Sequence, residues 1–359
     1  MQLHLPEQLL SRLSERVATD MGLHFPRERW RELEAGVQSA ADELGISDAA
    51  SCAHRLLSAP LSREQVEILA TGLTIGETYF FREDGSFKAI AGQILPELLR
   101  ARRESGRRLR IWSAGCCTGE EPYSIAIMLE RAIPDIADWQ ITLLATDVNP
   151  RFLRKAVDGT FGEWSFRDPP PWLKSTYFTS VAAHRYAISP RLRQRVSFAY
   201  LNLADEAYPS LATNTNAMDL IFCRNVLMYF PPAQAGCVVD RFHRSLAPQG
   251  WLVVGGADGT SQLLNEFAPT QFDGSVLYRK RPAPALPAAF AGSPLPDDSF
   301  LETAAAFGRI EVANATAGIA DSPPAEAAIA QPNPHTQALA LFGRGRYADA
   351  RRMLESIAF

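Results

Sequence analysis

A glycine-containing turn carries two adjacent carboxylates between a strand-like run and a helix-like run. Residues 113–121 are Ser-Ala-Gly-Cys-Cys-Thr-Gly-Glu-Glu. Open α/β sheets bind ligands where such strands end. The turn is neither GxGxxG nor a P-loop, because Glu120 and Glu121 stand where a phosphate would need a lysine or free amides. These carboxylates would repel a pyrophosphate and suit a ligand that carries positive charge.

Asp147 closes the next strand-like run, about 30 residues downstream, where such folds usually bind a ribose diol. Glu120 or Asp147 alone could be a helix cap or a strand-end turn residue. Together, and in this order, they favour a nucleoside with a cationic amino-acid tail. The sequence therefore predicts S-adenosylmethionine as cofactor rather than NAD or ATP.

Strand-like and helix-like runs alternate around these residues, which predicts a doubly wound, mostly parallel sheet covered on both faces. The predicted strands are 109–114, 141–146, 196–201, 218–223 and 251–255, with helices from 121 and 150 and one over about 233–246. A last strand at 275–280 should be antiparallel. Prolines at 169–171 interrupt the alternation, and we expect residues 186–189 to form a short hairpin with 196–198.

The flanking segments differ from this α/β region, which spans 76–281 with a small β insertion at 160–196. Residues 1–75 have helical periodicity and predict an all-α N-terminal domain, whose charged face is either solvated or docks an acidic partner. Residues 282–334 are a Pro/Ala-rich linker. Residues 335–359 resemble a partial tetratricopeptide helix pair and could recruit a protein partner. Since one pair cannot stack alone, a disordered tail or a docking helix is the alternative.

Composition excludes several classes of protein. The 359 residues are 47% hydrophobic with a net charge of −4, which is globular and lacks the basic footprint of a nucleic-acid coat. No run approaches the ~20 apolar residues of a membrane span, so we expect no membrane insertion and a cytoplasmic location. Five cysteines and six histidines have no metal-ligand spacing, so we expect no metal. Cys116 and Cys117 are interpreted as small packing residues of the turn.

Five motifs in order resemble the CheR family of chemoreceptor glutamate methyltransferases. They are GETYFFRE at 76–83, WSAGCCTGEEPYSIA at 112–126, ATD at 145–147, NL at 202–203 and FCRNVLMYF at 222–230. The resemblance implies an α-helical domain followed by a Rossmann-like methyltransferase domain with a small β-subdomain. It implies methyl transfer to glutamates on the cytoplasmic helical bundle of a methyl-accepting receptor. A methyltransferase of this family with a tetratricopeptide extension is similar to the members of its Wsp-type branch, which serves surface sensing.

The resemblance also implies a set of cofactor contacts. Asp147 should accept from the ribose, Glu120 should offset positive charge, and Asn202 should read the adenine edge. Arg82 should hold the cofactor carboxylate, so its loss should mainly weaken binding. Arg82 and Tyr229 are the candidates for assisting catalysis, although Tyr229 could be only an aromatic wall. The full set is Thr78, Arg82, Glu120, Asp147, Asn202, Leu203, Asn225 and Val226.

The implied reaction needs no general base, because a carboxylate is already ionised at pH 7. Three departures from the family bear on the details. Gly76 replaces an Asn, the 179–188 region lacks a glycine-rich loop, and 255–258 is Gly-Gly-Ala-Asp where relatives have Gly-His-Ser-Glu. The second departure predicts recognition independent of a receptor's C-terminal pentapeptide. Methylation of a small carboxylic acid, or a catalytically lapsed adaptor that senses the cofactor, remain the alternatives.

Overall fold

The computed structural model describes residues 5–104, 106–258 and 262–281. The described residues all belong to the first of the two units into which the chain divides, Met1–Ala285. The predicted linker and the predicted tetratricopeptide pair lie outside the described residues. The account below therefore concerns the first unit.

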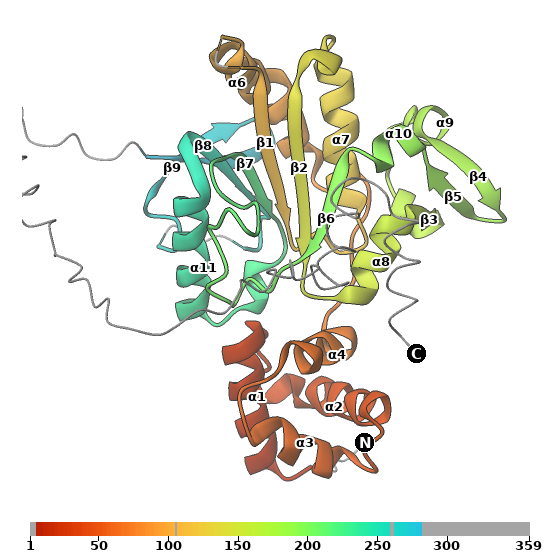
Figure 1. The fold of residues 1–359 in the computed structure, drawn as a ribbon, viewed down its shortest axis with the longest axis vertical. Helices are drawn as coiled ribbons and strands as arrows, with labels where there is room; N and C mark the ends of the chain where they lie inside the picture. The colour runs from red at the N-terminus through yellow and green to blue at the C-terminus, as the bar shows by residue number, and fades with distance from the viewer. Residues whose placement is uncertain (1–4, 105, 259–261, 282–359) are drawn as a thin grey trace, which may run out of the picture. The chain divides into compact units, whose positions relative to one another are not determined.

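Four amphipathic helices form an N-terminal bundle: α1 (Glu7–Met21), α2 (Trp30–Leu44), α3 (Ala49–Leu57) and α4 (Arg63–Leu73), with a 3₁₀ turn η1 (Arg27–Arg29) before α2 (Figure 1). Local sequence sets where the helices begin. The Asp48 carboxylate accepts from the Ser51 amide at the start of α3, and Ser62 and Gln65 form a capping box on α4. The apolar stripes meet in a core of their own, which includes Leu10, Leu33 and Leu69.

A seven-stranded sheet follows, in the order β6-β2-β1-β7-β8-β10-β9. Its strands are β1 (Arg108–Ala114), β2 (Gln140–Asp147), β6 (Val196–Tyr200), β7 (Met218–Cys223), β8 (Leu246–Val254), β9 (Phe267–Phe272) and β10 (Ser275–Lys280). The first five strands pair in parallel, and β10 is antiparallel to both neighbours. The predicted antiparallel last strand is confirmed. Its partner β9 was not predicted from the sequence.

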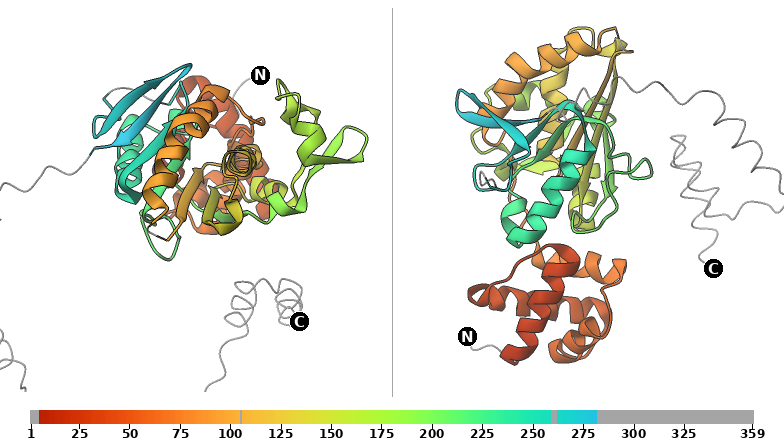
Figure 2. Two further views of the ribbon diagram at one scale, coloured as in Figure 1. Left: turned by 90° about the horizontal axis from the view of Figure 1, so that it is seen from above. Right: turned by 90° about the vertical axis from the view of Figure 1, so that its left-hand side faces the viewer.

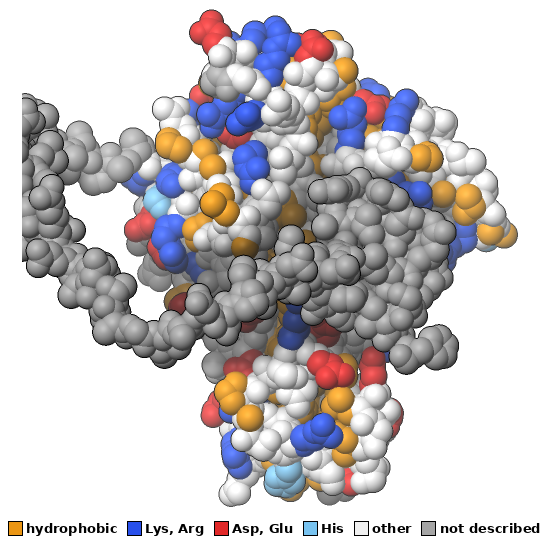
Figure 3. All heavy atoms as spheres, in the orientation of Figure 1, with side chains coloured by type: hydrophobic (Ala, Val, Ile, Leu, Met, Phe, Trp, Pro, Cys, Tyr) orange, Lys and Arg blue, Asp and Glu red, His pale blue; other side chains and the backbone are white. Residues whose placement is uncertain are grey.

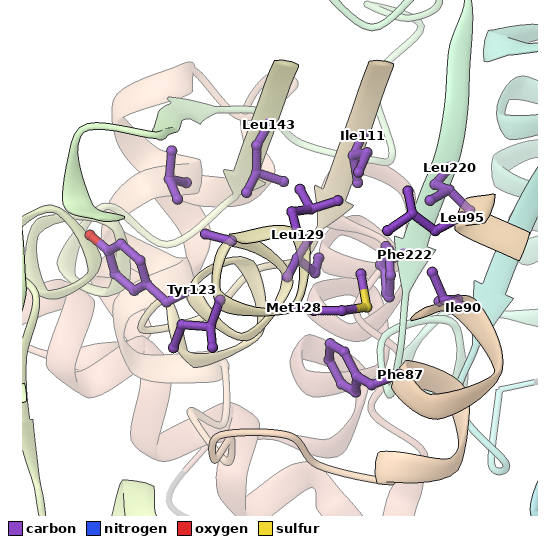
Figure 4. Close-up of a cluster of buried hydrophobic side chains, with 14 of the residues drawn as sticks. Phe87, Ile90, Leu95, Ile111, Tyr123, Met128, Leu129, Leu143, Leu220 and Phe222 are labelled. Atoms are coloured by element: carbon purple, nitrogen blue, oxygen red, sulfur yellow. The ribbon is translucent and has the colours of Figure 1, made fainter. Parts of the chain in front are cut away.

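Strand residues alternate between two cores, one on each face of the sheet. Ile111, Leu143 and Phe222 face α5 (Asp84–Ala89), the π-helical turn η2 (Ile90–Ile94) and α7 (Glu120–Ala132) (Figure 4). Trp112 and Ile221 face α11 (Pro232–Ser245) on the other side. The fold is thus a three-layer sandwich (Figure 2) of the doubly wound type. Outside the small inserted sheet, the other helical elements are α6 (Leu95–Arg102), η3 (Ile136–Asp138), α8 (Pro150–Asp158) and η5 (Leu227–Tyr229).

A small three-stranded sheet is inserted between β2 and β6. It contains β3 (Thr160–Gly162), β4 (Phe178–Ala182) and β5 (Arg185–Ile188) in the order β3-β5-β4, with η4 (Glu163–Phe166), α9 (Leu173–Tyr177) and α10 (Pro190–Arg193) beside the strands. The predicted hairpin between 186–189 and 196–198 is wrong. β5 pairs with β3 and β4, whereas β6 pairs in parallel with β2. The predicted partner 196–198 and the observed partners β3 and β4 all have strand-like sequence. The short helix α10, which lies between β5 and β6, directs the chain back to the large sheet.

Charges of both signs are distributed over the described part of the face in Figure 3. Several exposed charges of the described residues are paired, for example Arg279 with Glu97 at 2.7 Å and Arg151 with Glu43 at 3.0 Å. No described helix has the length and apolar character that a bilayer crossing requires.

Candidate cofactor site

A cavity lies at the carboxyl ends of β1, β2 and β7, where open α/β sheets place their ligands. The N-terminal bundle supplies part of its lining through Met21 at the end of α1, Leu23 just after it, and Leu73 at the end of α4. The loops of the sheet supply the rest. Eight predicted residues or candidates line the cavity, namely Thr78, Arg82, Asp147, Asn202, Leu203, Asn225, Val226 and Tyr229.

Hydrogen bonds hold the bundle against the sheet around this cavity. The Asn149 side-chain amide donates to the Ala70 carbonyl at 3.1 Å and to the Thr74 hydroxyl at 2.8 Å. The His24 amide donates to the Tyr229 carbonyl at 2.7 Å. These contacts fix the ends of α1 and α4 to the loops after β2 and β7. The bundle is therefore a wall of the cavity.

Asp147 ends β2 as a buried carboxylate that accepts two backbone hydrogen bonds. One oxygen accepts from the Cys117 amide at 2.9 Å and the other from the Asn149 amide at 2.8 Å. Burial raises the pKa of Asp147 to about 6, against the lowering effect of these bonds. Each oxygen retains a lone pair, and two such acceptors match the two hydroxyls of a ribose.

The two carboxylates of the turn have different surroundings. Glu120 is 3% exposed, accepts from Thr118 at 2.6 Å and Ser165 at 2.7 Å, and does not line the cavity. The predicted role of Glu120 toward the cofactor's positive charge therefore has no support in its position. Glu121 lines the cavity instead and accepts from the Ser113 hydroxyl at 2.7 Å. Adjacent helical residues point about 100° apart, and Glu121 is the one of the pair that faces the cavity.

Arg224 is a cavity residue to which the sequence prediction gave no role. Its side chain is 2% exposed and pairs with Glu121 at 3.4 Å and with Glu83 at 3.3 Å. It also donates to the Arg82 carbonyl. Its buried Nε has no hydrogen-bond partner among the described residues. The available signal was the Cys-Arg-Asn sequence at the end of β7, because an arginine directly after a buried strand is usually paired with an acidic group.

The loop before α5 brings Arg82 to the cavity. Arg82 donates to the Glu77 carbonyl at 2.9 Å, and its guanidinium carbon lies 5.8 Å from the centre of the Tyr79 ring. Phe81 and Glu83 on either side have positive φ angles of 56° and 52°. Such backbone is costly for non-glycine residues and is frequent at binding sites. The arginine is thus held in a constrained loop at the cavity.

Asn202 and Leu203 lie after β6, and the Asn202 side chain is largely occupied. Its amide nitrogen donates to the Asp20 carbonyl at 2.7 Å and to Asp205 at 2.9 Å, while its oxygen accepts from the Ala204 amide at 3.1 Å. Only one acceptor lone pair is left for an adenine edge. The main role of the Asn202 side chain in this geometry is to link α1 to the loop after β6.

The segment after β7 packs closely against the glycine turn. A Cβ on Gly115, whose φ is 78°, would lie 2.5 Å from Val226 Cγ2, so the turn requires glycine there. The Asn225 and Met228 amides donate to the buried carboxylate of Asp258. Asp258 thereby orders the loop that carries Asn225 and Val226 into the cavity.

The aromatic residues of the first and last motifs divide between core and cavity. Phe80 is fully buried, with its ring centroid 5.1 Å from that of Phe166. Tyr79 lines the cavity, and Tyr229 both lines it and packs on the helical bundle. For Tyr229, the wall interpretation thus accounts for the position of the ring.

The cavity fits S-adenosylmethionine in its chemistry. Asp147 offers acceptors for a ribose, Glu121 and Arg82 offer charges for an amino-acid tail, and Leu203 and Val226 offer apolar surface. Within the described ranges, no cluster of His, Cys, Asp or Glu could hold a metal ion. The order of the strands, the cavity at their carboxyl ends and the acidic residue that ends β2 together define an S-adenosylmethionine-dependent methyltransferase.

Comparison with known proteins gives the family. The model of the CheR methyltransferase SAM-binding domain matches residues 76–275, so the chain belongs to the CheR family. Chemotaxis protein methyltransferase 2 of Vibrio cholerae is 34% identical over 219 residues, which are 61% of this chain and 74% of that protein. The probable biofilm formation methyltransferase WspC of Pseudomonas aeruginosa is 31% identical over 251 residues, 69% of this chain and 56% of that protein. Among solved structures, the DszA carbon methyltransferase has a TM-score of 0.34 and 16% identity, covering 77% and 66% of the two chains.

Proposed function

We propose that the chain transfers the methyl group of S-adenosylmethionine to glutamate side chains on the cytoplasmic helical bundle of a methyl-accepting receptor. The products are a glutamate γ-methyl ester and S-adenosylhomocysteine. Membership of the CheR family, together with a strand-end cavity lined by Asp147, Glu121 and Arg82, carries the proposal. Bound cofactor supplies an electrophilic methyl group.

The residues of the cavity would bind, orient and exclude water rather than move protons. The acceptor carboxylate is ionised at neutral pH, so its oxygen can form the C–O bond directly as the S–C bond breaks and the electron pair stays on sulfur. Opposite charges neutralise each other along this path, which a dry and preorganised site favours. The helical bundle, through Met21 and Leu73, would exclude water from one side of the cavity.

Arg82 would bind the cofactor's carboxylate or orient the acceptor, with its loop held by Arg224. A guanidinium that gripped the acceptor carboxylate tightly would stabilise the ground state and slow the reaction. We therefore assign Arg82 primarily to binding and orientation. Tyr229 contributes the aromatic wall.

A Wsp-type pathway and recognition without a pentapeptide tether are the finer parts of the proposal. The similarity to WspC supports the pathway. The short β4–β5 hairpin, with no glycine between Phe178 and Ile188, supports independence from the tether. We further propose a cytoplasmic location, where receptor bundles are accessible, and a protein partner for residues 335–359.

The decisive experiment supplies S-adenosylmethionine labelled in the methyl group together with candidate receptor fragments. Label in a protein-bound ester that base releases as methanol supports the proposal. Label in a small carboxylic ester would point to a small-molecule substrate. Binding of the cofactor without any transfer would favour a lapsed, cofactor-sensing adaptor. A matched receptor fragment with its candidate glutamates changed to alanine is the control.

A further inference from the structure

The ring of Phe152 lies in the cavity beside Gly76, and the two positions depend on each other. A Cβ on Gly76 would stand 2.8 Å from Phe152 Cζ and 2.9 Å from Cε1, closer than real Cβ atoms approach carbon. The φ angle of Gly76 is not in the positive range, so the ring rather than the backbone conformation requires glycine here. Any side chain at position 76 would have to displace the ring.

Phe152 belongs to the cavity and not to a hydrophobic core. It is half-buried and lines the cavity, whereas its neighbour Leu153 packs against the core of the sheet. Among the described residues, Phe152 appears in none of the three core clusters. Its side chain therefore counts as part of the cavity lining.

The start of α8 fixes Phe152 beside Asp147. The Asn149 side-chain oxygen caps the helix by accepting from the Phe152 amide at 3.2 Å, and the Asn149 amide donates to Asp147 at 2.8 Å. The Cβ position of Gly76 lies 3.6 Å from Cys117 Sγ, and the Cys117 amide donates to Asp147. Phe152 and the carboxylate expected to bind the ribose thus line the same cavity and are linked through Asn149.

We propose that Phe152 is the aromatic wall against which the adenine of the cofactor packs, and that Gly76 is required to leave room for that ring. The inference rests on the proposed binding of S-adenosylmethionine and adds a specificity-determining pair to it. A planar purine beside a ribose-binding carboxylate gains from contact with a flat apolar ring, and such contacts tolerate little displacement.

The test measures the affinity of S-adenosylhomocysteine and of 5′-methylthioadenosine, which lacks the amino-acid tail, by calorimetry. Phe152→Leu should weaken both ligands by the same factor, about tenfold, because the lost contact is to their shared nucleoside. Gly76→Ala should weaken both to a similar extent. In a Phe152→Ala background, Gly76→Ala should have no further effect, since the ring it displaces is gone.

Phe272→Leu in β9 and Gly236→Ala in α11, whose added Cβ would meet no atom within 4 Å, are the matched controls. Circular dichroism verifies folding of every variant. Native affinity for both ligands in Phe152→Leu overturns the inference. The inference is also overturned if Gly76→Ala weakens binding by the same factor in the native chain and in the Phe152→Ala background. If the native chain itself fails to bind S-adenosylhomocysteine, the proposed function fails together with this inference. Binding by the native chain and by Phe152→Leu alike overturns the inference alone.

Discussion

Two groups of charged residues meet at the cavity and are built in different ways. The strand-end group is Asp147 with the amides of Cys117 and Asn149. The buried ion group is Arg224 with Glu121 and Glu83. The first depends on backbone groups of adjacent strand ends, and the second joins side chains from three distant segments.

The difference has energetic consequences. A carboxylate satisfied by backbone amides depends on the course of the chain, and the loss of its side chain leaves two donors that water or a ligand can satisfy. A buried arginine and its partners depend on one another, because the removal of one leaves an uncompensated charge. Changes in the strand-end group should therefore act mainly on ligand affinity, and changes in the ion group mainly on stability.

The largest effect should come from Arg224→Met. It removes a 2%-exposed guanidinium and leaves Glu121 without its cation, so the free energy of unfolding should fall by roughly 3–5 kcal/mol in urea titrations. Arg244→Met breaks a half-exposed pair with Asp240 on α11 and should cost less than about 1 kcal/mol. A loss below about 1 kcal/mol for Arg224→Met would show that the two groups do not differ in this way.

Asp147→Asn should weaken S-adenosylhomocysteine binding about 100-fold, with a smaller loss of stability than Arg224→Met. The variant removes the charge and sets an amide donor against one of the two backbone N–H groups, of Cys117 or Asn149, and the lost charge-assisted hydrogen bonding to the ligand corresponds to about 3 kcal/mol. Calorimetry measures the affinity. The control is Asp158→Asn, an exposed residue at the end of α8. An affinity within threefold of native would remove Asp147 from the binding site.

The pH dependence of binding sharpens the same point. Because burial raises the pKa of Asp147 to about 6, the carboxylate takes up a proton as pH falls through 6 and loses acceptor capacity. The affinity for S-adenosylhomocysteine should be constant above about pH 7 and fall by up to tenfold between pH 6 and 5. Asp147→Asn should lose this dependence. A native profile that is flat down to pH 5 would contradict the assignment.

The smallest effect should come from Glu120→Gln. Its side chain lies outside the cavity, and a glutamine can accept from one of the two hydroxyls of Thr118 and Ser165 and donate to the other, so the cofactor affinity should stay within about threefold of native. Glu121→Gln, which weakens the pair with Arg224 inside the cavity, is the paired comparison and should cost more in both affinity and stability. Greater sensitivity at Glu120 would restore the role first predicted for it.

Much of the sheet and of the strand-end group could be predicted from the sequence. Apolar runs separated by helical periodicity indicated β1, β2 and β7, and the position of Asp147 after the second strand follows from counting along the chain. The failures are specific. β9 has exposed positions and a proline, which hide its periodicity, and the segment 186–189 was matched with the wrong partner.

The sequence by itself determined which residues end the central strands, because this depends on the spacing of apolar residues along the chain. Only the tertiary structure decided that Glu121 rather than Glu120 faces the cavity, that Arg224 is buried between two carboxylates, and that the helical bundle forms a wall. Such features arise when segments far apart in the chain pack together, and no local pattern records which of several chemically suitable partners will meet.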